Sequence, residues 1–254
     1  MCYEVRSLTL SKLKYLKRYG GDVFEIKKLE KLIEQFSPQY HASGFDHPDL
    51  PVITNTLEIR TMNWGLIPHW TKNAADAVRI QNQTLNARAE SVFEKPAFKE
   101  SILRRRCLVL VDGFYEHHHK HGKTFPHHIL LKNQEPMSLA GIYDTWRSED
   151  MERTTFSIVT TKANGLMARI HNNPKMSEGP RMPVILSKEN EMDWLNWDGE
   201  NEAIIKELMA PFDETQMEAY TVPRLKGKQA TGNTEAAISK HTYQELVTEQ
   251  TDLF

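Results

Sequence analysis

The sequence has few cysteines and no long apolar segment. Cys2 and Cys107 are far apart and neither belongs to a Cys-x-x-Cys pair, which excludes the disulfide framework of a small secreted domain. No run approaches the roughly 18 apolar residues needed to cross a bilayer, and the chain start lacks the apolar block of a signal peptide. These absences predict a soluble protein of the cytosol that does not contact membranes.

The sequence also has no excess of positive charge. It contains 32 Lys and Arg against 34 Asp and Glu, a formal net charge of −2. A polyanion such as DNA must therefore bind at a local basic patch. With 254 residues, of which 39% are hydrophobic, the chain is long enough to bury one large core.

Periodicity and turn residues predict an α+β fold, a single domain over residues 1–254 with a mainly antiparallel sheet or barrel flanked by helices. Leucines spaced among lysines predict helix from Ser7 to Phe36, broken at Gly20-Gly21. Short apolar runs separated by turns predict strands that begin near residues 107, 127, 137, 156 and 182. Further helices are expected near 97–105, 191–197 and 202–211, so that a motif-bearing part, 2–186, precedes a helical part, 187–254.

Cys2 directly follows the initiator methionine. If Met1 is removed, Cys2 carries a free α-amine and a thiol on adjacent carbons, a pair that reacts with aldehydes. The reference pKa values are roughly 8 for the amine and about 8.5 for the thiol, so both groups are close to reactive at neutral pH. Cys107 opens an apolar strand and is expected to be buried.

Four other polar residues are candidates for chemistry, although each also has a structural interpretation. Asn86 could cap a helix that has Glu90 in its first turn. Glu116 follows an apolar strand and two aromatic residues, surroundings that could raise its pKa toward that of a proton donor. His171 precedes a Pro/Gly loop and Arg181 precedes a strand.

Two further stretches, one aromatic and one rich in histidine, each allow a structural and a functional interpretation. Trp64, Pro68 and Trp70, in "WGLIPHW", could pack in the core or form a wedge and stacking platform for unpaired bases. Six histidines lie within residues 117–128. Neither their type nor their spacing is typical of zinc sites, so we expect no metal and no cofactor.

The ordered series Cys2, "WGLIPHW", "NARAES", "CLVLVDGFYEH", "AGIYDTW", "SIVTTKAN" and "IH…RMPVIL" resembles the SRAP family. Members of that family, SOS-response-associated peptidases or abasic site processing proteins, attach to abasic sites in single-stranded DNA. The resemblance runs from Cys2 to about Leu186. It implies a monomer that senses abasic sites and binds single-stranded DNA.

The resemblance also assigns roles to residues. It implies that Cys2 is the nucleophile, Asn86 holds the adduct, Glu116 and His171 exchange protons, and Arg88 and Arg181 contact phosphates. Three departures stand out: Tyr3-Glu4 after Cys2, where Gly-Arg is common, predicts a bulkier and more acidic mouth of the site; His117 replaces a frequent Trp; and residues 172–180 are inserted before Arg181.

The chemistry that the resemblance implies is a thiazolidine link. The Cys2 amine forms a Schiff base with C1′ of the open sugar, and the thiol then adds to the same carbon. The family name also implies a peptidase activity that releases the residues before Cys2. Two alternatives stay open: a cysteine protease that uses Cys, His and Asn, and a DNA-binding protein without catalysis.

Overall fold

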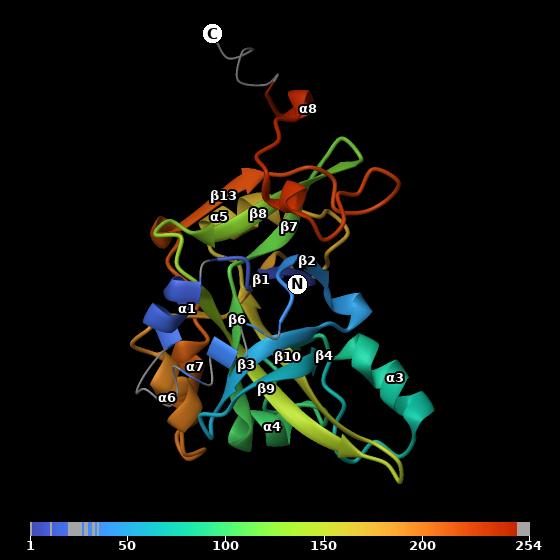
Figure 1. Ribbon diagram of the computed structural model, residues 1–254, viewed down its shortest axis with the longest axis vertical. Coiled ribbons are helices and arrows are strands. Elements are labelled where there is room, and N and C mark those ends of the chain that lie inside the picture. The colour runs from blue at the N-terminus through green and yellow to red at the C-terminus, as the bar shows by residue number, and fades with distance from the viewer. Residues whose placement is uncertain are drawn as a thin grey trace.

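The computed structural model describes residues 2–10, 12–19, 27, 30, 31, 34 and 36–247 of the chain. Its strands form two sheets that are stacked along the long axis of the molecule (Figure 1). Helices flank the larger sheet, and the described C-terminal segment ends beyond the smaller one. The predicted α+β fold with a mainly antiparallel, barrel-like core is confirmed.

The smaller sheet has five strands in the order β13-β8-β7-β1-β2. The strand after Cys2 lies inside this sheet, because β1 pairs with β2 on one side and β7 on the other. β7 and β8 form a long hairpin whose turn, His121-Gly122, has positive φ at both residues, as tight hairpins require. The strands are β1 Glu4–Ser7, β2 Gln39–Ser43, β7 Gly113–Lys120, β8 Lys123–Leu131 and β13 Met217–Thr221.

The larger sheet closes on itself. The pairings β10–β4, β4–β3, β3–β6, β6–β9 and β9–β10 form a ring, and three short strands are added at its edges. All these pairings are antiparallel except those of β10 with β4 and β5. The strands are β3 Asp49–Thr54, β4 Ile59–Trp64, β5 Asn86–Arg88, β6 Arg106–Val111, β9 Met137–Arg147, β10 Glu152–Lys162, β11 Arg181–Pro183 and β12 Ile185–Leu186.

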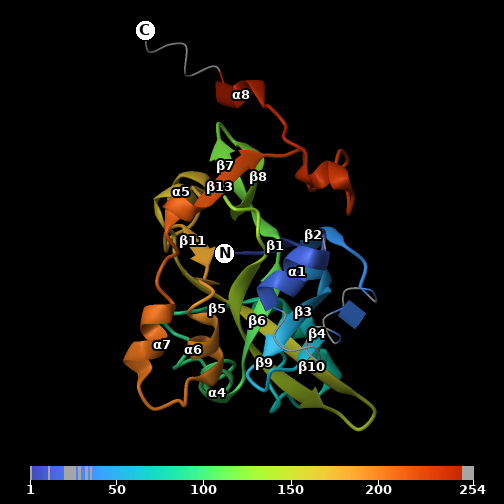
Figure 2. The same cartoon turned by 60° about the vertical axis from the view of Figure 1, so that its left-hand side comes forward.

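The helices are short and lie outside the sheets (Figure 2). Asparagine side chains cap three of them: Asn73 begins α3, Asn164 begins α5 and Asn201 begins α7, each accepting a hydrogen bond from a backbone N–H of the first turn. The α-helices are α1 Lys12–Tyr19, α3 Ala74–Gln83, α4 Lys99–Arg104, α5 Gly165–Ile170, α6 Glu191–Asn196, α7 Glu202–Leu208 and α8 Gln244–Val247, and the 3-10 helices are η1 Gly44–Asp46, η2 Glu214–Gln216 and η3 Glu235–Ile238.

Three predictions about local structure are wrong. The helix expected from Ser7 begins only at Lys12, because Ser7 belongs to β1; most of the predicted helix from 20 to 35 lies outside the described residues. Asn86 caps no helix but begins β5, which pairs with β10. The part from 187 onward is not purely helical, since β13 completes the smaller sheet. In each case pairing with a distant strand decides the conformation.

Two large apolar clusters hold these layers together. One lies between the sheets and joins Cys2 and Val5 to Trp64, Leu85 and Phe156 of the larger sheet and its connections. The other packs the outer face of the barrel against the helices. In the part of the chain that the structure describes, no helix is long and apolar enough to cross a membrane.

Candidate functional site

The thiol of Cys2 is buried at the start of the smaller sheet. Only 1% of the residue is exposed. The next residue is fixed by the backbone, because the carbonyl of Tyr3 accepts a 2.8 Å hydrogen bond from the N–H of Gly44. Burial, together with the negative charge of Glu116, raises the pKa of the Cys2 thiol far above its usual value. The thiol is therefore protonated and needs a base before it can attack.

Glu116 and His171 lie side by side, and the Glu116 carboxylate is near enough to Cys2 to act on its thiol. Oε2 of Glu116 is 2.9 Å from Nδ1 of His171, and both side chains are about nine-tenths buried. Glu116 comes from β7, whereas His171 ends α5 and is held there by its backbone N–H, which donates to Met167. Nδ1 of His171 is also 2.8 Å from the carbonyl oxygen of Arg181. Glu116 and His171 line, with Tyr3, a cavity of about 490 Å³.

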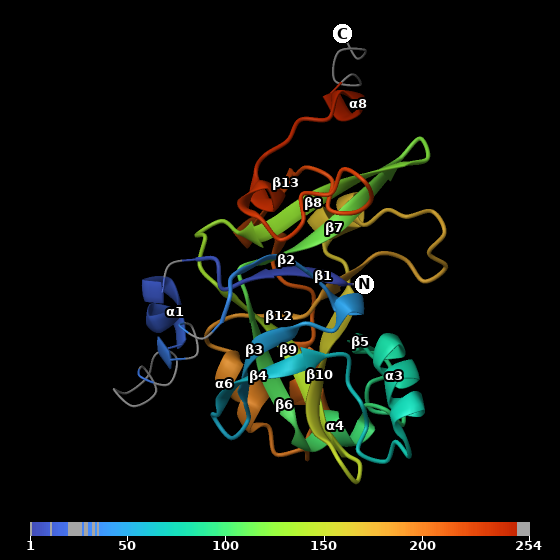
Figure 3. The ribbon, with the colours of Figure 1, turned by 45° about the vertical axis from the view of Figure 1, so that its right-hand side comes forward.

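Asn86 presents a buried amide for which the described residues offer no hydrogen-bond partner. It is 8% exposed, and neither polar atom of its side chain makes a hydrogen bond within the described part of the chain. A buried amide without partners costs about 1–3 kcal/mol of stability, so such a group indicates a binding site. Figures 2 and 3 show its strand, β5, close to the start of the chain. Leu85, just before Asn86, belongs to the same apolar cluster as Cys2.

A second cavity joins Asn86 to two other predicted residues. It has a volume of about 520 Å³ and is lined by Trp70, Asn86, Arg88 and Lys95, among others. Trp70 is 48% exposed. Arg88 is one-third exposed and pairs with Glu178 and, at 4.0 Å, with Glu90. Such exposed pairs are weak, so a phosphate can replace these carboxylates. Lys95 adds a cation that the sequence did not single out.

The structure contradicts the predicted phosphate contact by Arg181. Its guanidinium is buried and donates to both carboxylate oxygens of Glu90, at 3.0 and 2.8 Å, and to the carbonyl of Thr160 at 2.8 Å. Because the residue is 4% exposed and most of its donors are used in these contacts, the guanidinium does not face solvent where a backbone phosphate would bind. Arg181 therefore connects β11 to β10 and to the segment after β5.

The stacking roles predicted for Trp64 and Pro68 are also wrong. Trp64 has no exposed surface, its indole N–H donates to the carbonyl of Leu85 at 2.8 Å, and its ring stacks on Phe156. Pro68 is buried and its carbonyl accepts from the N–H of Thr71. The burial of Trp64 follows from its position on β4 between the two sheets. Of the three residues, Trp70 alone can meet a base.

Glu4 does not make the mouth of the site acidic, as its position after Cys2 had suggested. It is 2% exposed, and its carboxylate lies 2.7 Å from Nζ of Lys226, 3.3 Å from Nε2 of His41 and 3.6 Å from Nδ1 of His117. Burial alone would raise the pKa of Glu4, but these three partners lower it to about 2. No local pattern marks Lys226 as the partner of Glu4.

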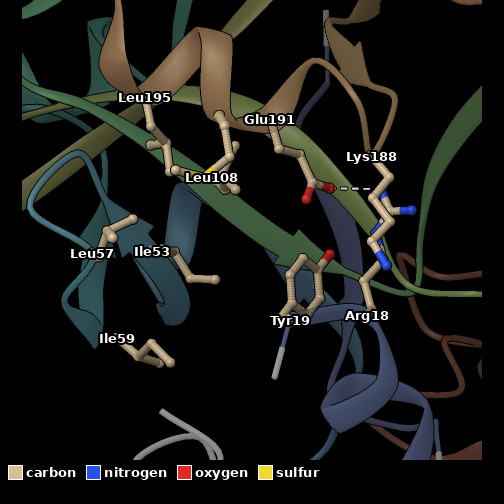
Figure 4. A pocket seen from close by; sticks show the side chains of 10 residues that line it. Arg18, Tyr19, Ile53, Leu57, Ile59, Leu108, Lys188, Glu191 and Leu195 are labelled. Atoms are coloured by element: carbon tan, nitrogen blue, oxygen red, sulfur yellow. Dashed lines mark hydrogen bonds and ion pairs between the residues drawn. The ribbon is translucent and has the colours of Figure 1, made fainter. Parts of the chain in front are cut away.

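The sequence predicts no role for the remaining histidines, and the remaining cavities are lined by no residue of the predicted site. Among the residues that the structure describes, no three His, Cys, Asp or Glu side chains are arranged to hold a metal ion. A cavity of about 310 Å³ between α1, α6 and the barrel is lined mainly by aliphatic side chains (Figure 4). At its polar end Arg18 pairs with Glu191 at 2.6 Å, and Glu191 also accepts from Ser138. This ion pair connects α1 to α6.

The chain belongs to the SRAP family, described as SOS response associated peptidase, whose family model matches residues 1–228. It is similar to the abasic site processing protein YoqW of Bacillus subtilis, with 37% identity over 202 residues, or 76% of this chain and 85% of YoqW. It is 30% identical to HMCES of Rattus norvegicus, also described as an abasic site processing protein, over 71% of this chain and 59% of that protein.

A crystal structure of a Bacteroides thetaiotaomicron protein shows the same fold. The two chains are 36% identical, with a TM-score of 0.82 over 95% of this chain and all of the other. A more distant structure, from Bordetella bronchiseptica, has a TM-score of 0.71 at 20% identity and supports the fold alone. The arrangement of two stacked sheets is thus shared with solved proteins.

Proposed function

We propose that this chain recognises abasic sites in single-stranded DNA and attaches to them covalently through Cys2. The observation that carries this proposal is that the charge of Glu116 acts on the buried thiol of Cys2, while Glu116 itself contacts His171 and both residues line one cavity. The names of the similar proteins support the same conclusion. The substrate is the open-chain aldehyde form of the abasic deoxyribose.

The proposed reaction begins once the residue before Cys2 has been removed. The α-amine adds to C1′ of the aldehyde, and loss of one water gives an imine. The thiol sulfur then bonds to C1′ while the imine nitrogen takes up the thiol proton, which closes a five-membered thiazolidine. The net change is an amine, a thiol and an aldehyde converted to thiazolidine and water. A lysine can complete only the first of these steps.

Each polar side chain has a task that its position allows. Glu116, when protonated, donates to the ring oxygen of the closed sugar and so favours ring opening. His171, which contacts Glu116, transfers protons between amine, hydroxyl and thiol. The unpartnered amide of Asn86 holds the adduct as a neutral donor and acceptor. Arg88 and Trp70 bind the phosphate and a base of the adjoining strand.

The peptidase activity that we propose is the release of Met1, the residue before Cys2. A thiol adjacent to the scissile bond and the neighbouring Glu116–His171 pair can assist that hydrolysis. This step is tested by mass spectrometry of wild-type protein and of His171→Ala. Both proteins are prepared in the absence of aminopeptidase. An equal fraction of cleaved chain in both samples assigns removal to another enzyme.

A single gel tests the crosslink itself. Protein that begins at Cys2 is incubated with a single-stranded oligonucleotide containing one abasic site, then denatured and separated. We expect a band that contains both protein and DNA. The matched control is the same oligonucleotide reduced beforehand with borohydride, which removes the aldehyde and must give no band. Absence of the band with the unreduced oligonucleotide refutes the proposal.

A cysteine protease fits the geometry less well. In such enzymes an Asn orients the catalytic His, whereas here the Asn86 amide has no partner and His171 contacts Glu116. Turnover of a peptide substrate without DNA would favour the protease. Reversible DNA binding that is unchanged in Cys2→Ala, with no denaturation-resistant product, would favour a protein that only binds DNA.

A further inference from the structure

A cavity outside the proposed reaction site has the composition of a small-molecule site. It lies between α1, α6 and the barrel, has a volume of about 310 Å³, and is lined by none of the residues assigned to the reaction (Figure 4). Cavities that hold small ligands measure roughly 300–1,000 Å³ and are mostly apolar, with a few polar groups that orient the ligand. This cavity therefore meets the general requirements for a second binding site.

Aliphatic side chains form one end of the cavity. Ile53 and Ile59 come from β3 and β4, and Leu57 lies in the turn between these strands. Leu57 is 43% exposed, and Met192 of α6, which also lines the cavity, is 45% exposed. A ligand with an aliphatic chain would shield this apolar surface from water.

Polar side chains gather at the opposite end, as Figure 4 shows. Arg18 donates to Glu191 at 2.6 Å, and Glu191 accepts a second hydrogen bond from Ser138 at 2.6 Å. The side chain of Arg18 is 13% exposed, and its Nε has no hydrogen-bond partner among the described residues. Because a buried donor without a partner lowers stability, a hydrogen-bond acceptor on a ligand is favoured at this end.

The charges at this end determine which acceptor fits. Two cations, Arg18 and Lys188, and one carboxylate, Glu191, line the cavity in the described part of the chain, which leaves a balance of one positive charge. Lys188 is exposed and acts on Glu191 through its charge. One positive charge suits a monoanion such as a carboxylate. A phosphate monoester carries about −1.5 to −2 charges near pH 7 and would be repelled more strongly by Glu191.

We propose that this cavity binds a free carboxylic acid with an aliphatic chain of medium length. The carboxylate of the ligand accepts a hydrogen bond from Arg18 and lies near Lys188, and its chain extends toward Leu57 and Ile59. The bound ligand thereby bridges α1, the barrel and α6. This proposal does not depend on the proposed DNA chemistry, because the two sites share no residue, and either can fail without the other.

The first test is calorimetric titration of the full chain with hexanoate, octanoate and octanol, each at concentrations where it is monomeric. We expect one octanoate to bind per chain. Each added methylene should tighten binding about fourfold as long as the chain fits the cavity. Octanol has the same chain without the charge and should bind more weakly than octanoate. Absence of saturable octanoate binding, or octanol that binds equally well, overturns the proposal.

The second test uses variants to locate the bound ligand. Lys188→Ala should weaken octanoate binding about two- to fivefold, because the lost charge is exposed, and should leave octanol binding unchanged. Lys228→Ala is the matched control: it removes an exposed lysine from the segment after β13 and should change neither. Equal octanoate affinity in Lys188→Ala and Lys228→Ala overturns the proposed carboxylate position.

The aliphatic end is tested by Ile59→Trp, which fills it. Binding of both octanoate and octanol should be lost while circular dichroism shows a folded protein. Full binding by this variant overturns the proposed chain position, and if the variant does not fold, the Lys188→Ala comparison decides.

A second copy of the chain is the other occupant that the apolar mouth of the cavity allows. Sedimentation of wild-type protein and of Met192→Asp without ligand distinguishes the two. A dimer that Met192→Asp dissociates, together with no octanoate binding, assigns the mouth to a protein interface and overturns the proposal. Equal sedimentation of the two proteins supports the small-molecule site.

Discussion

Oε2 of Glu116 lies 2.9 Å from Nδ1 of His171, although the two residues come from β7 and the end of α5. Both residues are buried, and the charge of Glu116 acts on the thiol of Cys2. We expect Glu116→Gln and His171→Ala each to slow adduct formation about 10²- to 10⁴-fold under single-turnover conditions. Affinity for undamaged DNA should stay nearly the same. Wild-type crosslinking rates in both variants would show that the assigned proton transfers are wrong.

The double variant Glu116→Gln/His171→Ala tests whether the two residues act together. Because they share a contact, the loss in the double variant should be smaller than the product of the single losses. The measurement is the single-turnover rate of all four proteins at one pH. Losses that multiply would indicate two independent roles.

Cys2 is tested by three changes. Cys2→Ala should lose the durable link, while its α-amine still forms an imine that borohydride traps. Cys2→Ser should form a weaker adduct, because a hydroxyl is the poorer nucleophile near pH 7. Placing a bulky residue between Met1 and Cys2, which blocks methionine removal, should abolish the link although the thiol remains. A stable thiol-dependent adduct from this blocked protein would contradict the thiazolidine.

Asn86 should show opposite effects on stability and activity. Its amide is buried and makes no hydrogen bond to any residue that the structure describes, so Asn86→Leu removes an unsatisfied polar group. We expect the free energy of unfolding to be unchanged or to rise by about 1 kcal/mol, while crosslinking slows. Urea denaturation gives the first quantity and the gel assay gives the second. A destabilisation of several kcal/mol would mean that the amide supports the fold instead.

Substitution of Arg88 and of Arg181 should affect different properties, DNA binding for Arg88 and stability for Arg181. Arg88→Ala should weaken binding to single-stranded DNA similarly for all sequences and flatten the salt slope by about 0.7. Arg181→Ala should instead lower the free energy of unfolding by about 1–3 kcal/mol, because it removes a buried guanidinium and leaves the buried carbonyl of Thr160 without its donor. Fluorescence anisotropy and urea denaturation measure the two effects. An unchanged slope in Arg88→Ala removes Arg88 from the contacts.

Glu4 makes stability depend on pH. Its pKa is about 2 in the folded chain against a usual 4.5, so the stability that it contributes is present above pH 4.5 and is lost as the pH falls toward 2. The contribution is about 3 kcal/mol at most. Glu4→Gln should therefore flatten the fall in the free energy of unfolding over that range. An identical acid slope in Glu4→Gln and wild type would contradict the ion pair.

Several features of this protein are local in the chain, and the sequence alone determined them. The position of the Cys2 thiol next to the α-amine of the same residue follows from covalent structure alone. The strands β6 and β9 and the short helices α4, α6 and α7 follow from apolar spacing and turn residues, close to where that spacing predicts them. Each of these depends on residues within a few positions of one another.

The tertiary structure decided which residues of distant segments lie next to one another. Trp64 and Trp70 look alike in the sequence, yet one lies between the sheets and the other at a cavity. Arg88 and Arg181 look alike too, but closure of the barrel brings Glu90 against the buried guanidinium of Arg181 and leaves Arg88 at the surface. Burial and ion pairing act through space between distant segments, and no local pattern encodes that proximity.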